Sequence, residues 1–123
     1  MSEAAKRVLV VDDRPDIVGF VCAELERAGY AVESAGNGRQ ALERQRERAA
    51  DLMLVDIFMP EMDGIETIHS VRAQYPQTRI VAMSSGVYGM QDYLKVARDI
   101  GADATLAKPF GVDELLQVIR TVL

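Results

Sequence analysis

The sequence is short of residues that several classes of protein require, starting with cysteine. Its 123 residues include one cysteine, Cys22, so no disulfide can form within the chain. The longest apolar runs have about four residues, whereas a membrane-spanning helix needs about 20. No signal-peptide pattern precedes the first apolar run. Together these absences predict a reducing, cytoplasmic location with no membrane association.

Positive charge is also scarce. The chain has 14 Lys and Arg against 19 Asp and Glu, which gives a net charge of −5 at pH 7. Direct binding to nucleic acid or to an anionic membrane usually needs a basic patch, so this balance argues against both. The hydrophobic fraction of 49% and the charged fraction of 27% are typical of a globular domain. We expect a single domain over residues 1–123, with no output domain.

One stretch organises the rest of the chain. An apolar run at 52–55 leads directly into Asp56, and a loop containing Pro60 and Gly64 follows. A short apolar run that ends in such a loop predicts a buried parallel strand. Asp56 then lies where the strand leaves the sheet. From these residues alone, its carboxylate is a metal ligand, a nucleophile or a helix cap.

Strand patterns and helix patterns alternate five times along the sequence. The predicted strands are 7–11, 30–35, 52–55, 80–83 and 104–107, and the predicted helices are 15–28, 40–50, 65–75, 91–100 and 112–122. This alternation predicts an α/β fold, a doubly wound parallel sheet with helices on both faces. Sheets of this kind bind ligands at the carboxyl ends of their strands.

Polar residues follow four of the predicted strands at that edge. In chain order they are Asp12, Asp13, Asp56, Ser84, Ser85 and Lys108. If the first and third strands are neighbours, three carboxylates meet within a few ångströms. Two like charges about 4 Å apart repel by roughly 4 kcal/mol at an effective dielectric of 20, so the cluster needs a cation or protons. Hard oxygen ligands without histidine or cysteine suit Mg²⁺.

Lys108 is the second residue that indicates the chemistry of this edge of the sheet. A lysine beside three acids can simply neutralise them. A metal ion and an ammonium on opposite sides of a carboxylate also make a place for a phosphoryl group, with a serine hydroxyl donating to a third oxygen. The group left to attack phosphorus is Asp56, which would become an acyl phosphate.

Five motifs in this order, each at a predicted strand end or loop, resemble the receiver domains of two-component response regulators. They are Val-Asp-Asp at 11–13, Val-Asp-Ile-Phe-Met-Pro-Glu-Met-Asp-Gly at 55–64, Ala-Met-Ser-Ser at 82–85, Gly-Ala-Asp-Ala at 101–104 and Lys-Pro-Phe at 108–110. The resemblance covers essentially the whole chain. It implies a flavodoxin-like (βα)5 fold, a five-stranded parallel sheet in the order 2-1-3-4-5.

The resemblance also implies a metal site. In this family Mg²⁺, for which Mn²⁺ can substitute, would be held directly by Asp13, Asp56 and the backbone carbonyl of Phe58. Asp12 would assist through a water molecule.

The same resemblance assigns the phosphoryl chemistry. Asp56 would accept a phosphoryl group from the phosphohistidine of a sensor histidine kinase or a histidine phosphotransfer protein. Ser84 would donate its hydroxyl to the phosphoryl group, Lys108 would pair with it, and the bond before Pro109 would be cis. The change would alter the surface near the fourth helix, fifth strand and fifth helix, and so signal to a downstream protein. We expect a monomer or weak dimer that is not a turnover enzyme.

This sequence departs from the family pattern at Thr105 and in the loop at 86–90. The family usually has Tyr or Phe three residues before the lysine, but Thr105 stands here and has no ring. We hypothesise that the loop at 86–90, which is longer than usual, is the moving part and that Tyr88 supplies the ring. Phe58 and Gly86 flank the approach of hydrolytic water and carry no polar side chain, so we predict slow loss of phosphate.

Several other functions are compatible with parts of this pattern. The chain could be a phosphorelay intermediate, or the N-terminal receiver of a longer regulator. A haloacid-type aspartyl-phosphate phosphatase would want an Asp-x-Asp pattern on the first strand, but Asp12 and Asp13 are adjacent and no cap segment exists. In a flavodoxin-like cofactor binder the acids would repel the flavin phosphate. The complete set of acids, serine and lysine speaks against a pseudo-receiver.

Plainer roles remain open for several of these residues. Asp12 and Asp13 can cap the first helix, and Ser84 can be an ordinary hydroxyl at a strand end. Cys22 is interpreted as a packed thiol, and His69 as an exposed residue on a helix.

Overall fold

The structure is a computed structural model that describes residues 5–57, 64–84 and 90–123, without the side chains of 90–94. Within these ranges the elements are β1 (Arg7–Val11), α1 (Pro15–Arg27), β2 (Ala31–Ala35), α2 (Gly38–Glu47), β3 (Leu52–Asp56), α3 (Gly64–Gln74), β4 (Arg79–Ser84), α4 (Met90–Asp99), β5 (Ala104–Ala107) and α5 (Val112–Val122). All neighbouring strands are parallel, in the order β2-β1-β3-β4-β5. The predicted fold and strand order are therefore confirmed.

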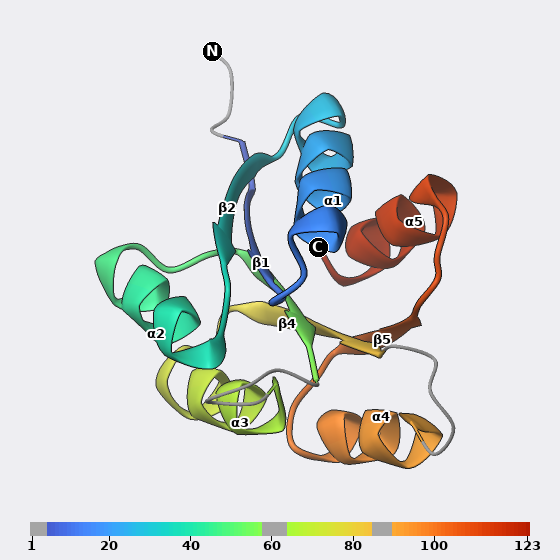
Figure 1. The fold of residues 1–123 in the computed structure, drawn as a ribbon. Coiled ribbons are helices and arrows are strands. Elements are labelled where there is room, and N and C mark those ends of the chain that lie inside the picture. The colour runs from blue at the N-terminus through green and yellow to red at the C-terminus, as the bar shows by residue number, and fades with distance from the viewer. Residues whose placement is uncertain (1–4, 58–63, 85–89) are drawn as a thin grey trace.

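Helices cover both faces of the sheet. Figure 1 shows α1 and α5 on one face and α2, α3 and α4 on the other. The alternation of side chains along each strand divides the core between these faces. In β1, Val8 and Val10 pack with α1 and α5, whereas Leu9 and Val11 pack on the other side. No helix in the described part of the chain is long and apolar enough to cross a membrane.

The ends of α2 differ from the prediction for local reasons. Oδ1 of Asn37 accepts a 2.9 Å hydrogen bond from the backbone N–H of Gln40, so this side chain caps the helix ahead of its predicted start. Arg48 has an extended backbone with φ of −161°, so the helix ends before the predicted Ala50. Its buried residues also include Gln45, which the hydrophobic pattern did not indicate.

α1 ends one residue before its predicted end at Ala28. Val21 and Leu25 are buried, and Ala28 is exposed. Ala28 is the C-cap residue of the helix, and Gly29 turns the chain toward β2 with a φ of 100°. The helix therefore ends at Arg27, one residue earlier than the sequence pattern indicated.

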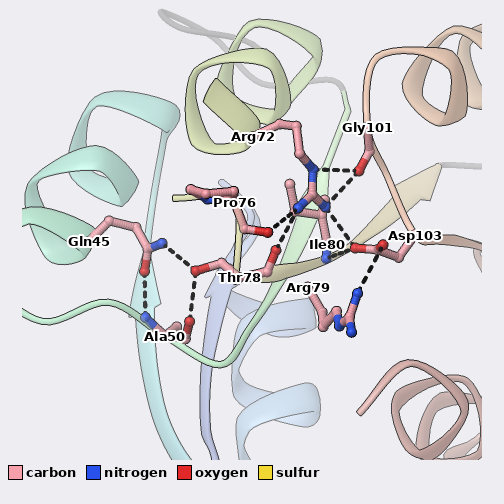
Figure 2. A network of polar contacts seen from close by, with 9 residues as sticks. All are labelled: Gln45, Ala50, Arg72, Pro76, Thr78, Arg79, Ile80, Gly101 and Asp103. Atoms are coloured by element: carbon pink, nitrogen blue, oxygen red, sulfur yellow. Dashed lines mark hydrogen bonds and ion pairs between the residues drawn. The ribbon is translucent and has the colours of Figure 1, made fainter. Parts of the chain in front are cut away.

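Two polar networks connect the segments at the amino ends of the strands, opposite to the acid-bearing carboxyl ends (Figure 2). In the first, the buried Gln45 amide donates to Thr78 Oγ1 at 3.1 Å and accepts from Ala50 N–H at 2.6 Å. Thr78 in turn donates to the Ala50 carbonyl at 2.8 Å. Gln45 is buried because every polar atom of its amide that faces the core finds a partner there.

The second network centres on the guanidinium of Arg72 at the end of α3. It donates to the carbonyls of Pro76, Thr78 and Gly101, and it pairs with Asp103 at 2.7 Å. These partners belong to the loop between α3 and β4 and to the loop between α4 and β5. One side chain therefore holds two connections together (Figure 2).

Candidate functional site

Asp12 lies at the carboxyl end of β1, directly after the buried run Val8–Val11. It follows Val8 and Val10 in the alternation of the strand and so faces the side of α1 and α5. The residue is 1% exposed. Oδ1 accepts a 3.0 Å hydrogen bond from the backbone N–H of Arg14, and Oδ2 accepts one of 2.6 Å from Nζ of Lys108. Both oxygens thus have partners inside the chain.

Asp56 ends β3 and is 4% exposed. The register pairs Val11 of β1 with Val55, so the residue that follows β1 comes to lie beside Asp56. The Asp56 side chain shares the face of Leu52 and Leu54, which pack with α1 and α5. Strand pairing and alternation together bring the two acids to the same place.

Lys108 approaches the acids from the end of β5. Its backbone N–H donates to the carbonyl of Ser84 at 2.8 Å, and the following peptide bond, to Pro109, is cis as predicted. The side chain is 7% exposed, and Nζ lies 2.6 Å from Asp12 Oδ2 and 3.5 Å from Asp56 Oδ2. The ammonium therefore bridges the two buried carboxylates.

The expected meeting of three carboxylates is confirmed. One oxygen each from Asp12, Asp13 and Asp56 lie within 4.8 Å of one another. Asp13 is exposed while the other two are buried, so the cluster opens to solvent on one side. Among the described residues Lys108 is the one cation that contacts the cluster, which leaves an excess of two negative charges.

This donor set fits Mg²⁺. It offers carboxylate oxygens without histidine or cysteine, its excess charge matches a divalent cation, and one side is open for water or a phosphate oxygen. The predicted third ligand, the carbonyl of Phe58, lies outside the described residues. The metal-binding role of Asp13, Asp56 and Asp12 is consistent with this geometry and stays a prediction.

Ser84 reaches the same edge of the sheet at the end of β4. It is 1% exposed, and the register pairs it with Ala107, the residue before Lys108. Its role toward a phosphoryl group remains a prediction. The predictions for Ser85, for the loop at 86–90 with Tyr88, and for the 58–63 segment also lie outside the described residues.

The plainer interpretations have mixed outcomes. No side chain caps α1 at its N-cap residue, Arg14, although Asp12 accepts the N–H of that residue. His69 is exposed, as predicted. Cys22 is partly buried and packs beside the core under α1 and α5. Burial raises the pKa of the Cys22 thiol, and the nearby Glu26 carboxylate adds to the increase.

Thr105, which stands where the family has an aromatic ring, is partly buried on β5. Its hydroxyl accepts a 3.2 Å hydrogen bond from Nη2 of Arg98 on α4. A polar contact between α4 and β5 therefore occupies the position of the ring.

Two contributions to the site were missed in the sequence. The backbone N–H of Arg14 orients Asp12, and a backbone donor leaves no signal in residue types. Gly64 lies against the backbone of Asp56, although the sequence indicated only that it belongs to a loop.

An apolar groove of about 260 Å³ runs beside Lys108. It is formed by α1 and the loop between β5 and α5, and its lining residues are Arg14, Ile17, Phe20, Lys108, Pro109 and Phe110. Phe20 is 41% exposed, which is unusual for so large an apolar side chain. The groove gives the acid cluster an apolar flank.

The structure is thus a doubly wound parallel α/β domain with three acids and a lysine at the carboxyl edge of its sheet. The response regulator receiver domain profile matches residues 8–120. The chain therefore belongs to the response regulator receiver family.

Curated relatives agree with this assignment. The chain is 36% identical over 120 residues to the chemotaxis protein CheY of Bacillus subtilis, covering 97% of this chain and 98% of CheY. It is 31% identical over 118 residues to sporulation initiation phosphotransferase F of the same organism, covering 96% and 94%. It is 40% identical to the transcriptional regulatory protein ZraR of Klebsiella oxytoca over the whole chain, which spans 27% of ZraR.

Solved structures carry the same fold. Chemotaxis protein CheY4 of Vibrio cholerae superposes with a TM-score of 0.89 at 34% identity, over 98% of this chain and all of CheY4. Response regulator TrrA of Thermotoga maritima, in complex with Mg²⁺-BeF, superposes with a TM-score of 0.85 at 30% identity, over 96% and 99%.

Proposed function

We propose that this receiver is phosphorylated on Asp56 by the phosphohistidine of a sensor kinase or a histidine phosphotransfer protein. The observation that carries the proposal is the buried ammonium of Lys108, which bridges Asp12 and Asp56 within a cluster of three carboxylates. A structural lysine would need only one carboxylate to neutralise it. Three acids around one lysine leave room for further positive charge.

The residues divide the work of the transfer. A carboxylate oxygen of Asp56 attacks phosphorus, the bond from phosphorus to the histidine nitrogen breaks, and the electron pair stays on the imidazole. Bound Mg²⁺ would supply positive charge to the phosphoryl oxygens from the side of Asp13. Lys108 would leave its contact with Asp56 to pair with a second phosphoryl oxygen, and Ser84 would donate to a third.

The structure of TrrA supports a role for Mg²⁺ at this site, since that protein shares the fold and is in complex with Mg²⁺-BeF. In the present chain the corresponding edge of the sheet carries the acid cluster and Lys108. We propose Mg²⁺ as the resident metal, with Mn²⁺ as a substitute.

A partner would meet the site from its open side. The apolar groove that contains Phe20 adjoins Lys108, so a helical partner that carries the donor histidine can bury apolar surface there. We propose that the phosphorylated chain then signals to a downstream protein through α4, β5 and α5, where Arg98 binds Thr105. Such a receiver acts in the cytoplasm as a monomer or weak dimer.

Small-molecule phosphorylation tests the proposal. The purified chain is incubated with phosphoramidate and MgCl₂, and its intact mass is measured. We expect one phosphoryl group on the wild type, none after EDTA, and none on Asp56→Asn. Asp99→Asn, an exposed change on α4, is the matched control and should be labelled normally. Labelling of Asp56→Asn at the wild-type rate would overturn the assignment.

A relay function of the same site is the second candidate, favoured by the similarity to sporulation initiation phosphotransferase F over most of both chains. In a relay, the phosphoryl group on Asp56 would move onward to a histidine. Incubation of the phosphorylated chain with purified histidine phosphotransfer domains separates the two: a relay transfers label within minutes, whereas a terminal receiver keeps it.

A further inference from the structure

Gly64 is the first residue of α3 and lies against the phosphoacceptor strand. It is buried. A Cβ atom at this position would lie 2.2 Å from the carbonyl oxygen of Asp56 and 2.4 Å from Cα of Ile57. Both distances are far shorter than an ordinary contact between nonbonded atoms. The start of α3 therefore touches the end of β3 with no room for a side chain.

Space, not backbone conformation, excludes a side chain here. Among the described glycines, positive φ angles occur at Gly29 and Gly101, and Gly64 is not one of them. Any residue could adopt its backbone angles. The requirement for glycine comes from the neighbouring strand alone.

The atoms that a side chain would strike cannot move independently. They are backbone atoms, and the strand end is tied to β4, where Ile57 N–H donates to the carbonyl of Met83 at 3.0 Å. Ile57 itself is 2% exposed and packs in the core. A methyl group at Gly64 must push either α3 or the Asp56 backbone away, by about 1 Å to reach an ordinary contact.

We propose that Gly64 is a positioning residue for Asp56, because its missing side chain fixes where that carboxylate stands relative to Asp13 and Lys108. The inference rests on the proposed function of Asp56. A displacement of about 1 Å in a reacting group can cost roughly 100-fold in rate. Changes behind a metal ligand cost about 10- to 100-fold in metal affinity.

The test uses Gly64→Ala with two readouts. Mg²⁺ affinity is measured by titrating ¹⁵N-labelled protein with MgCl₂ and following amide shifts. The rate of phosphorylation is measured with phosphoramidate, which needs no partner protein. We expect the variant to bind Mg²⁺ at least about tenfold more weakly and to be phosphorylated roughly 100-fold more slowly.

Gly101→Ala is the matched control for general loss of stability. Gly101 has a φ of 131°, and a Cβ there would lie 2.8 Å from Cγ of Arg72, so this change is also strained. It precedes β5 at the amino ends of the parallel strands, whereas Asp56 ends β3 at their carboxyl ends. We expect Gly101→Ala to lower the unfolding temperature and to leave Mg²⁺ affinity unchanged.

Gly19→Ala protects the test against a failure to fold. Gly19 is exposed within α1, no atom lies within 4 Å of a Cβ there, and alanine favours the helix. Gly64→Ala is therefore also made in the Gly19→Ala background. If that double variant does not fold, Gly64 has a purely structural role and the proposal is overturned.

The remaining outcomes separate the two proposals. Wild-type Mg²⁺ affinity in Gly64→Ala would overturn the positioning role, as would an equal loss of affinity in Gly101→Ala. A wild-type chain that binds Mg²⁺ but is never phosphorylated would overturn the proposed function, while the Mg²⁺ titration still decides the role of Gly64.

Discussion

Lys108 donates a 2.6 Å hydrogen bond to Asp12, a residue 96 positions earlier in the chain. Both side chains are at least nine-tenths buried, at 7% and 0% exposed. A bond of this kind holds the end of β5 to the end of β1 across the sheet. It also leaves the acid cluster dependent on a single ammonium among the described residues.

We therefore predict that Lys108→Met destabilises the metal-free chain by about 3 kcal/mol, since removal of one partner leaves buried charge uncompensated. Mg²⁺ should restore part of this loss, because the cation replaces the missing charge. Urea unfolding with EDTA and with MgCl₂ measures both effects. Lys95→Met, at an exposed position on α4, is the control. Equal stability of Lys108→Met and wild type in EDTA would contradict the prediction.

Asp13 should behave in the opposite way. It is the exposed member of the cluster, so its repulsion by the other acids is close to the value in water, about 1 kcal/mol at 4 Å. We predict that Asp13→Asn stabilises the metal-free chain by about this amount and abolishes the rise in unfolding temperature with MgCl₂. Thermal unfolding over a series of Mg²⁺ concentrations checks it. A rise equal to that of wild type would show that Asp13 does not bind the metal.

Cys22 gives a prediction for alkaline pH. Burial raises the pKa of its thiol in the folded chain, so the unfolded thiol ionises first as pH increases. The stability linked to this shift is fully present below the unfolded pKa, about 8.5, and is lost as pH rises through the higher folded pKa. Wild type should therefore lose more stability than Cys22→Ala between neutral and alkaline pH. Urea unfolding of both proteins isolates the thiol, because all other titrating groups are shared.

The acid cluster could be predicted because its members are marked locally. Asp12 and Asp56 each end an apolar run, and parallel strands gather their carboxyl ends at one edge. The order of the strands could not be predicted in this way, because no residue in β1 indicates which strand lies beside it. That order came from the resemblance to receiver domains and was confirmed by the pairing.

The polar networks at the amino ends of the strands could not be predicted from the sequence. Gln45 lies in a helix rich in Arg and Glu and had no reason to be buried until Thr78, 33 residues later, supplied a partner. The Arg72 guanidinium likewise meets Gly101 and Asp103 only after α4 and β5 are in place. Side chains whose burial depends on distant polar partners leave no periodic signal.

The lifetime of the phosphoryl group tests the expectation for Phe58 and Gly86. Neither residue carries a polar group that could orient a water molecule for attack on the acyl phosphate. We predict that phosphate on Asp56 persists for minutes or longer after the donor is removed, and that Phe58→Asn shortens its lifetime. Intact mass measured at intervals after desalting gives both half-lives. A wild-type half-life of seconds would contradict the prediction.

Arg72 should matter far more than its neighbour Arg79, although both contact Asp103 (Figure 2). Arg72 is 26% exposed and donates to three backbone carbonyls, whereas Arg79 is 55% exposed and has one ion pair of 3.8 Å. We predict that Arg72→Ala lowers the free energy of unfolding by about 2–3 kcal/mol, because charged hydrogen bonds to backbone carbonyls are lost, and those to Thr78 and Gly101 are partly buried. Arg72→Lys should recover little, since one ammonium cannot replace the planar fork. Arg79→Ala should cost less than about 0.5 kcal/mol. Urea unfolding of the three variants measures these free energies. Equal losses of unfolding free energy for Arg72→Ala and Arg79→Ala would mean that the Arg72 network contributes no more than a surface ion pair.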